Sequence, residues 1–300
     1  MDSVMNSSNK IGVVTVTFNS GHVLEQFLYS LASQTYGEFL IYAVDSGSQD
    51  NTIELLEAWA DDRLRVIPNS NNVGVAEGDN QGIQAALSDG CDYVLLLNND
   101  VEFEPETFAI LIAELNALDC DLLAPKILYQ DGIHVCSAGG YFSVLKGYLG
   151  SQTGYREIDR GQYDLPRRIR NASGCCLLAR SKIFNQIGMM DVKYFVYHED
   201  SDFLFRAWRA GLTMFYTPRA RIFHKVSSLT GGPKSLFSIR YSARGHVYFM
   251  LKNLGAMRCL FYLPALQLRM LIKLIFHTIS WNEYVIRQRA FFEGIAVWAS

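Results

Sequence analysis

The chain has 300 residues, of which 49% are hydrophobic, 19% charged and 13% aromatic. This length is enough to bury a large core and corresponds to one large domain or about two ordinary ones. With 7 prolines, 23 glycines and no low-complexity tract, the composition excludes a disordered chain and a fibrous repeat.

The formal net charge of −3 hides a segregation of charge along the chain. Residues 236–300 carry 8 lysines and arginines against 2 acidic residues, a balance of +6. Residues 1–235 carry 19 against 28, a balance of −9. Because the basic charge is confined to one end, we expect no nucleic-acid partner and a separate role for the tail.

The cysteines lack both the paired spacing of a zinc site and the regular spacing of a disulfide framework. They are Cys91, Cys120, Cys136, Cys175, Cys176 and Cys259. We expect buried free thiols in a reducing cytoplasm. The first ten residues are polar and lead straight into an apolar run, so no secretory signal is predicted.

Short apolar runs typical of buried strands alternate with segments of helical spacing in the first hundred residues. The predicted strands are 11–18, 40–44, 64–67 and 93–97, and the predicted helices are 23–31, 51–60 and 76–87. Such alternation predicts an α/β protein with a parallel, doubly wound sheet.

Polar side chains follow three of these strands, at the edge where such sheets bind ligands. Asn19 follows the first strand, Asp45 the second and the Asn-Asn-Asp run 98–100 the fourth. The aspartate of that run suits a divalent cation and equally suits a helix N-cap. Asp45 would either cap the helix near residue 51 or accept the imide N–H of a pyrimidine base. Glycine-rich loops for NAD or for ATP phosphates are missing.

Three carboxylates stand within four residues at Glu199, Asp200 and Asp202. Such crowding persists where a cation, an arginine or catalysis compensates, and it raises the pKa of at least one carboxyl. A helix N-terminus is the alternative explanation. His224 follows another apolar stretch and, taken alone, is more typical of a packing residue.

In order and spacing, six segments resemble the family-two inverting glycosyltransferases of GT-A fold. They are VVTVTFNS, VDSGSQDNT, NSNNVGVAEGDNQGI, LLLNNDVEFEP, NASGCCLLARSKIFNQIGMMD and FVYHEDSDFLFRAWRAG, which cover roughly residues 11–225. The chain is most similar to the subgroup that makes bacterial cell-surface polysaccharides and includes rhamnosyltransferases. The resemblance implies a mixed, mainly parallel central sheet, with a catalytic domain at 1–235 and a helical region at 236–300.

The resemblance also implies a nucleotide-sugar site. Its residues would be Thr17, Phe18, Asn19, Asp45, Asn72, Gly74, Asn80, Asn98, Asn99, Asp100, Ser173 and Gly174. The first three would line the base and ribose pocket, and Asp45 would bind the base edge. Asn72 and the turn at Gly74 would close over the nucleotide, and Asn80 would open onto the same cleft. The segment at 173–174 would line the sugar and acceptor side.

The metal and the catalytic base are implied in the same way. Asp100 matches the final aspartate of the family's DxD motif, whereas Asn98 and Asn99 replace its leading positions. One carboxylate would therefore bind Mg²⁺ or Mn²⁺, and His224 would complete the metal shell. Asp200, with Glu199 beside it, occupies the position of the base, and we expect Glu199 and Asp202 to raise its basicity.

The implied reaction moves a sugar from a nucleoside-diphosphate donor to a glycan or polyprenyl-linked acceptor. The subgroup favours dTDP-L-rhamnose, and UDP-sugars stay open because uracil offers Asp45 the same edge. A non-catalytic nucleotide-sugar-binding homologue is the alternative, but it would be expected to lack Asp100 or Asp200. The glycine-rich stretch 132–170 is either a solvated hairpin or a mobile loop that meets acceptor or phosphates.

The stretch 259–281 is strongly apolar but contains Pro264, Arg269 and Lys273. The charges of Arg269 and Lys273 are costly in a bilayer core, which disfavours a membrane span of about 20 residues. Interleaved basic and apolar residues favour a helix in an anionic membrane interface. A helical subdomain packed on the catalytic core, or a homodimer partner, is the alternative. We therefore expect contact with the inner face of the cell membrane through residues 259–300.

Overall fold

The computed structural model describes residues 9–225, 231, 232 and 234–300. The predicted absence of a secretory signal rests on residues 1–10, most of which lie outside this described part. The four strands predicted in the first hundred residues are confirmed. They are β1 (Ile11–Thr17), β2 (Phe39–Asp45), β3 (Leu64–Pro68) and β4 (Tyr93–Leu97), and all pair in parallel.

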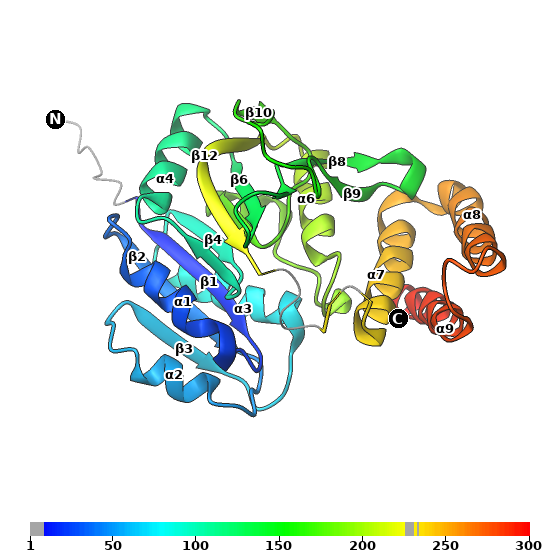
Figure 1. The fold of residues 1–300 in the computed structure, drawn as a ribbon, viewed down its shortest axis with the longest axis horizontal. Coiled ribbons are helices and arrows are strands. Elements are labelled where there is room, and N and C mark those ends of the chain that lie inside the picture. The colour runs from blue at the N-terminus through cyan, green and yellow to red at the C-terminus, as the bar shows by residue number, and fades with distance from the viewer. Residues whose placement is uncertain (1–8, 226–230, 233) are drawn as a thin grey trace.

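The predicted helices are confirmed as α1 (Gly21–Ala32), α2 (Thr52–Ala58) and α3 (Gly74–Ser88). The parallel, doubly wound pattern ends at β4, because β11 (Cys176–Arg180) inserts antiparallel between β4 and β6 (Leu122–Tyr129). Beyond it, β12 (Met214–His224) runs parallel to β6. The sheet is therefore mixed and mainly parallel, as the family resemblance implied (Figure 1).

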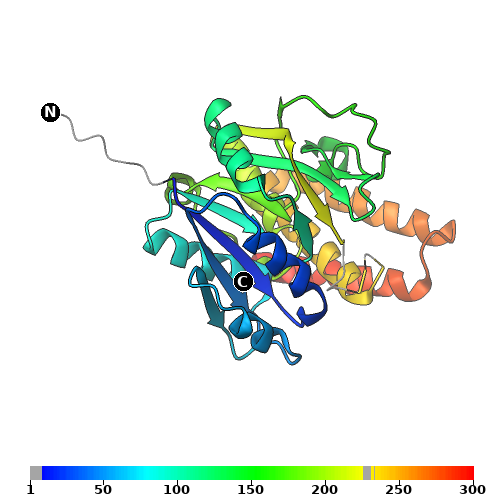
Figure 2. The same cartoon turned by 60° about the vertical axis from the view of Figure 1, so that its left-hand side comes forward.

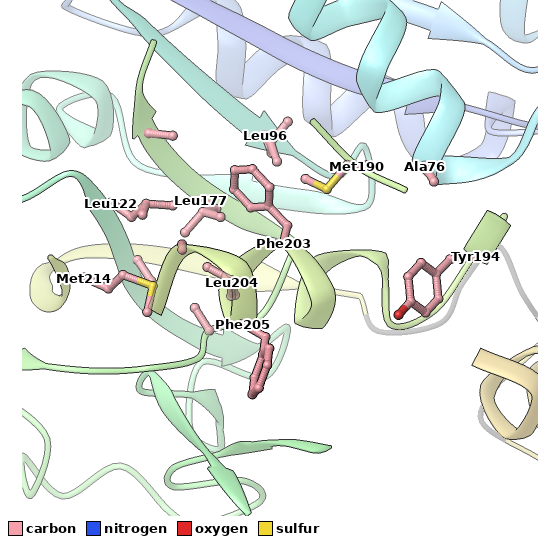
Figure 3. Packing of buried hydrophobic residues seen from close by; sticks show 14 of the residues in the cluster. Ala76, Leu96, Leu122, Leu177, Met190, Tyr194, Phe203, Leu204, Phe205 and Met214 are labelled. Carbon is pink, nitrogen blue, oxygen red and sulfur yellow. The ribbon is translucent and has the colours of Figure 1, made fainter. Parts of the chain in front are cut away.

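Alternate side chains along the central strands build two cores, because successive residues of a strand point to opposite faces. Val13 and Leu95 join the core beneath α1, α2 and α4 (Thr107–Ala117). Val14 and Leu96 join the core beneath α3 and α6 (Glu199–Arg209). Figure 3 shows part of this second core, where Phe203 of α6 lies close to Leu96. The six cysteines are buried and form no disulfide, as predicted.

Helix α3 lies unusually close to β1 because two glycines face the strand. A Cβ atom built at Gly82 would come within 2.3 Å of Val14 Cγ1, and one at Gly78 within 2.7 Å of Val16 Cγ2. A side chain at either position would push the helix away from the sheet. The close approach fixes the N-terminal half of α3 beside the ends of the parallel strands, where Asp79 is placed.

The stretch 132–170 contains a hairpin and short edge strands. Strand β8 (Gly140–Ser143) pairs antiparallel with β9 (Leu149–Gln152), and the 3₁₀-helix η1 (Val144–Lys146) forms the tip. Phe142 packs against Phe205 and Trp208 of α6, with ring centroids 5.2 and 5.7 Å apart. The hairpin alternative is therefore correct in shape, although one side of the hairpin is packed rather than solvated. The remaining short elements are β5 (Val101–Phe103), β7 (Val135–Ser137), β10 (Arg167–Arg168), α5 (Lys182–Ile187) and η2 (Val192–Tyr194).

The basic tail forms three helices, α7 (Leu236–Leu254), α8 (Ala256–Ile275) and α9 (Trp281–Ala299). Helix α7 packs against both others, and Figure 2 shows α8 and α9 beyond the sheet. The apolar run 259–281 is broken after α8, where His277 has a φ of 52°. In the described part of the chain, no helix is both long and apolar enough to cross a membrane.

Buried Asp202 fastens the tail to the catalytic part. Its Oδ2 accepts from Arg206 Nε and Lys252 Nζ, both at 2.9 Å. Its Oδ1 accepts from Asn253 Nδ2 at 2.8 Å and Tyr194 Oη at 3.2 Å. A carboxylate that is fully buried is tolerated only with such partners. Asp202 therefore joins α6, η2 and α7 in one unit.

We predict that Asp202→Asn lowers the free energy of unfolding by about 3 kcal/mol, because it leaves two partly buried cations without their carboxylate. Urea denaturation followed by circular dichroism measures the change. The control is Asp62→Asn, at an exposed position, which we expect to behave as the wild type. A loss below about 1 kcal/mol for Asp202→Asn, the scale of an exposed pair, would contradict the anchoring role.

Candidate active site

The ends of β1 and β2 are joined through the Asp45 carboxylate. The parallel register sets Thr17 beside Asp45, and Thr17 Oγ1 donates to Asp45 Oδ1 at 2.9 Å. Ser48 donates to the same carboxylate through Oγ at 2.6 Å and through its backbone N at 2.9 Å. The helix-cap alternative for Asp45 is wrong, because Asp50 is the residue that accepts from the first amide of α2, Thr52 N.

The loop after β1 is held in place by Asn19, which adopts a φ of 50°. Asn19 N donates to Ser48 Oγ at 2.9 Å, and Asn19 Oδ1 accepts from Gln49 N at 2.8 Å. The neighbouring Phe18 is 37% exposed, so its ring is available at this edge of the sheet. Asn19 thus positions the loop, whereas Phe18 presents a surface to a ligand.

Of the two predicted residues at the start of α3, Asn72 is exposed and Gly74 is buried. Asn72 Oδ1 accepts from Gly74 N at 2.9 Å. Gly74 has a φ of 80°, and a Cβ there would lie 2.5 Å from the Phe195 carbonyl oxygen. Gly74 is thus required for close packing against the segment that precedes α6.

Asn80 does not open onto the cleft as predicted. Its Nδ2 donates to Met190 O at 2.9 Å, and its Oδ1 accepts from Met190 N at 2.8 Å. Both ends of the carboxamide are therefore used to tether the segment between α5 and η2. These two bonds give Asn80 a structural role.

The run that follows β4 has one residue facing inward and one facing outward. Asn99 is buried, and its Nδ2 donates to Val16 O at 2.9 Å and to Ser20 Oγ at 3.1 Å. Asn98 is exposed, and its backbone N donates to Cys175 O at 2.9 Å. Asn99 therefore fastens the run to β1, and Asn98 is the asparagine available to a ligand.

Asp100 and His224 meet although 124 positions separate them. Strand β5 pairs antiparallel with β12 and sets Val101 beside His224, so that His224 Nε2 lies 3.1 Å from Asp100 Oδ1. Burial disfavours the imidazolium, but nearby Cys175 and the hydrogen bond with Asp100 raise the pKa of His224 well above its usual value. The helix-cap alternative for this run is wrong, because α4 begins at Thr107.

The spacing of this pair fits a divalent cation. Mg²⁺ takes octahedral ligands at about 2.0–2.1 Å, which puts neighbouring ligands about 3 Å apart. The observed 3.1 Å between Asp100 Oδ1 and His224 Nε2 matches that separation. No group of three potential ligands among His, Cys, Asp and Glu occurs in residues 9–225, 231, 232 and 234–300. Two protein ligands would leave the remaining coordination positions to substrate oxygens and water.

The candidate base lies at the start of α6, against the predicted segment 173–174. Gly174 N donates to Asp200 Oδ2 at 3.1 Å, and Ser201 N donates to Asp200 Oδ1 at 2.6 Å. A Cβ at Gly174 would come within 2.9 Å of Asp200 Cβ. Ser173 accepts from Cys175 N at 3.4 Å. Since Cys175 O also accepts from Asn98 N, this segment joins the base to the strand-end run.

A third carboxylate of the site, Asp79 on α3, was not predicted, although it stands inside the quoted motif directly before Asn80. Burial and the neighbouring Asp200 raise the pKa of Asp79 to about 8. Burial, Asp200 and Asp79 raise the pKa of Glu199 well above its usual value. Burial also raises the pKa of Asp200, although backbone amides oppose the shift.

The predicted source of this crowding was partly wrong. Asp202 was expected to crowd Asp200, but Arg206 and Lys252 neutralise it and hold it within the core. The third acid beside Glu199 and Asp200 is therefore Asp79 rather than Asp202. The pKa of all three carboxyls is therefore raised, and protons held among them reduce the repulsion between their charges.

We predict that Asp79 makes folding stability fall as pH rises. A carboxyl whose pKa is raised in the folded state stabilises the fold below its ordinary pKa of 3.8, and this contribution is lost as pH rises through about 8. Asp79→Asn should therefore gain about 2 kcal/mol over the wild type between pH 5 and pH 9, after a discount for partial exposure. Urea denaturation at the two pH values measures this gain. The exposed control Asp62→Asn should show the same pH dependence of stability as the wild type. If Asp79→Asn also matched the wild type at both pH values, the raised pKa of Asp79 would be refuted.

A sequence model described as Glycosyl transferase family 2 matches residues 12–188. The chain is 30% identical over 241 residues to the N-acetylglucosaminyl-diphospho-decaprenol L-rhamnosyltransferase of Mycobacterium tuberculosis, covering 73% of this chain and 77% of that protein. It is 20% identical over 168 residues to the dTDP-rhamnosyl transferase RfbF of Shigella flexneri, covering 55% and 53%.

Two solved structures share the fold. GalNAc-T7 with UDP, GalNAc and Mn²⁺ has a TM-score of 0.62 at 18% identity, covering 79% of this chain and 47% of that chain. S. aureus TarS 1-349 in complex with UDP has a TM-score of 0.58 at 18% identity, covering 96% and 80%. These likenesses confirm the predicted fold.

Proposed function

This chain belongs to glycosyl transferase family 2, and from that premise we propose that it transfers L-rhamnose from dTDP-L-rhamnose to a lipid-linked glycan acceptor, with inversion at the anomeric carbon. The family predicted from the six ordered segments is confirmed. The observation that carries the proposed chemistry is the position of Asp200. Its carboxylate is held by Gly174 N and Ser201 N at the edge of the sheet where the strand-end residues gather.

Asp200 would act as the general base. The acceptor oxygen forms a bond to the anomeric carbon while the bond from that carbon to the diphosphate oxygen breaks, and the proton passes to the Asp200 carboxylate. A single displacement inverts the anomeric centre and needs no enzyme nucleophile. The two backbone amides orient the carboxylate, and burial raises its pKa, which keeps it basic.

Asp45 and the loop after β1 would bind the thymine base. Thr17 and Ser48 fix the orientation of the Asp45 carboxylate, which suits acceptance of a hydrogen bond from the imide N–H. Phe18 offers an exposed ring for stacking. Uracil carries the same imide edge, so Asp45 selects the pyrimidine rather than the sugar. The choice of rhamnose is supported by the printed names of the two bacterial relatives.

Asp100 and His224 would hold Mg²⁺ or Mn²⁺. When bound, such an ion neutralises negative charge on the leaving diphosphate, a contribution of several kcal/mol. GalNAc-T7, which shares the fold, was solved with Mn²⁺ and UDP. Exposed Asn98 lies beside this pair and would contact the donor as well.

Helix α8 would lie on an anionic membrane that carries the acceptor. Its exposed apolar residues stand at helical spacing on one face and form one stripe: Met257, Leu260, Phe261, Leu268, Leu271, Ile272 and Ile275. Arg258, Arg269 and Lys273 follow at spacings of eleven and four, which places them along one flank of the stripe. An apolar face with basic residues at its edge is typical of an interfacial helix.

We predict that Asp200→Asn reduces transfer by at least about a hundredfold, because the base contributes roughly 10²–10⁴-fold. Binding of dTDP, measured by calorimetry, should stay within about twofold of the wild type, since Asp200 does not contact the base or the cation pair. Exposed Asp119→Asn is the matched control. Equal loss of transfer and of dTDP binding in Asp200→Asn would favour a structural role for Asp200.

The donor is tested separately with the wild type. Failure to hydrolyse dTDP-rhamnose in the presence of Mg²⁺ or Mn²⁺ would refute dTDP-L-rhamnose as the donor.

We predict that Phe261→Glu with Leu268→Glu releases the protein from anionic phospholipid vesicles. Each exposed apolar side chain contributes about 1.5–3 kcal/mol when buried, so two changes should lower co-sedimentation at least about tenfold. Tyr29→Glu, at an exposed aromatic position on α1, is the control. Unchanged co-sedimentation of the α8 variant would exclude this face as the membrane contact.

A further inference from the structure

A cavity of about 280 Å³ lies between the tip of the β8–β9 hairpin and the three C-terminal helices. It is separate from the strand-end residues described above. The basic and histidine side chains that line it come from five different elements or their flanks: Lys146, His198, His246, Arg269, Lys273 and Arg287. The hairpin and α8 are also in contact elsewhere, since the Arg258 guanidinium lies 5.6 Å from the Tyr148 ring centre.

The cavity is cationic. Lys146, Arg269, Lys273 and Arg287 carry its charge, and none of the described residues that line it is acidic. Glu283 lies nearby but is engaged by Arg287, at 2.9 Å from Nε and 2.8 Å from Nη2. Burial and the neighbouring Arg269 and Arg287 lower the pKa of Lys273. Four cations with one nearby carboxylate are costly to crowd together, and a multiply charged anion would offset that cost.

The two histidines supply polar walls rather than charge. His198 Nε2 lies 3.0 Å from the Ser242 carbonyl oxygen, and His246 Nε2 lies 3.0 Å from the Lys146 carbonyl oxygen. Burial lowers the pKa of both rings to about 4, so both are neutral at physiological pH. These bonds also hold η1 and α7 in place around the cavity.

The cavity adjoins the catalytic helix. His198, which lines it, directly precedes Glu199 and the base Asp200 at the start of α6. In a glycosyl-diphospho-lipid, one sugar ring separates the attacking hydroxyl from the diphosphate. An anion in this cavity would therefore place that sugar toward Asp200, and the lipid would leave along α8, whose apolar stripe borders the basic flank.

We propose that this cavity binds the diphosphate of the lipid-linked acceptor, with Arg269 and Lys273 as its principal ligands. The inference rests on the proposed function, because it names the acceptor class of the same site. Arginine and lysine are the side chains that bind phosphate oxygens by charge-assisted hydrogen bonds. A free diphosphate would satisfy the same chemistry, so the test must separate the two sources.

The test is calorimetric titration of the full chain with farnesyl diphosphate, in saturating dTDP and Mg²⁺ to block the donor site. We expect Arg269→Ala with Lys273→Ala to weaken binding at least about tenfold. Arg160→Ala with Arg289→Ala removes two exposed cations outside the cavity and should bind as the wild type. Arg269→Gln with Lys273→Met retains side-chain length and should reproduce the loss if the alanine pair unfolds.

Inorganic diphosphate and farnesol complete the titration. Both should bind more weakly than farnesyl diphosphate, since each lacks one half of the recognised group. If inorganic diphosphate bound as tightly as farnesyl diphosphate, the cavity would be a site for a free anion. If farnesol bound as tightly, the basic side chains would not contribute to binding. Either result, or equal losses in the cavity and control pairs, would overturn the proposal. Hydrolysis of dTDP-rhamnose by the wild type tests the proposed function separately, because it needs no acceptor.

Discussion

The buried carboxylate of Asp202 is the interaction on which the rest of the molecule depends. It collects Arg206 from its own helix, Tyr194 from η2, and Lys252 and Asn253 from α7. Without these partners, a charge at a position with 0% exposure would be expelled from the core. The same contacts join α6 to η2 and seat α7, the first of the C-terminal helices, on the rest of the molecule. One ion cluster thus couples the geometry of the base to that of the tail.

The acids of this region fall into two groups with opposite surroundings. Asp202 and Asp191 share Lys252, and in Asp191 the bonds from Lys252 and Tyr248 outweigh burial and lower the pKa of the carboxyl. Among the residues that the structure describes, no cation forms a salt bridge with Asp79, Glu199 or Asp200, and the pKa of each is raised. Helix α6 therefore separates a neutralised acid that stabilises the fold from the acids that include the proposed base Asp200. The uncompensated acids lower the stability of the fold, and the ion pairs of Asp202 offset that loss.

The basic and apolar residues of the tail lie where the proposed acceptor would bind. Several of its basic residues make specific contacts: Lys252 bonds Asp202, Arg240 bonds Glu293, and Arg269 and Lys273 line the cavity beside α8. The outward side of α8 is apolar. A membrane-bound acceptor would therefore meet an apolar face, then a cationic cavity, then the base, in the order in which a lipid, a diphosphate and a sugar follow one another in such a molecule.

Local pattern determined the first half of the fold. Apolar runs and helical spacing predicted β1 to β4 and α1 to α3, since each segment buries its own face against the next. Ordered motifs likewise marked Asp45, Asp100 and Asp200. Long-range placement was decided by tertiary structure: antiparallel β11 enters between β4 and β6, and β12 carries His224 to Asp100. The crowding of Asp200 by Asp79 rather than Asp202, and the use of Asn80 as a tether, were decided there too. Those outcomes depend on which charges and amides meet across distant segments, and spacing along the chain carries no information about such meetings.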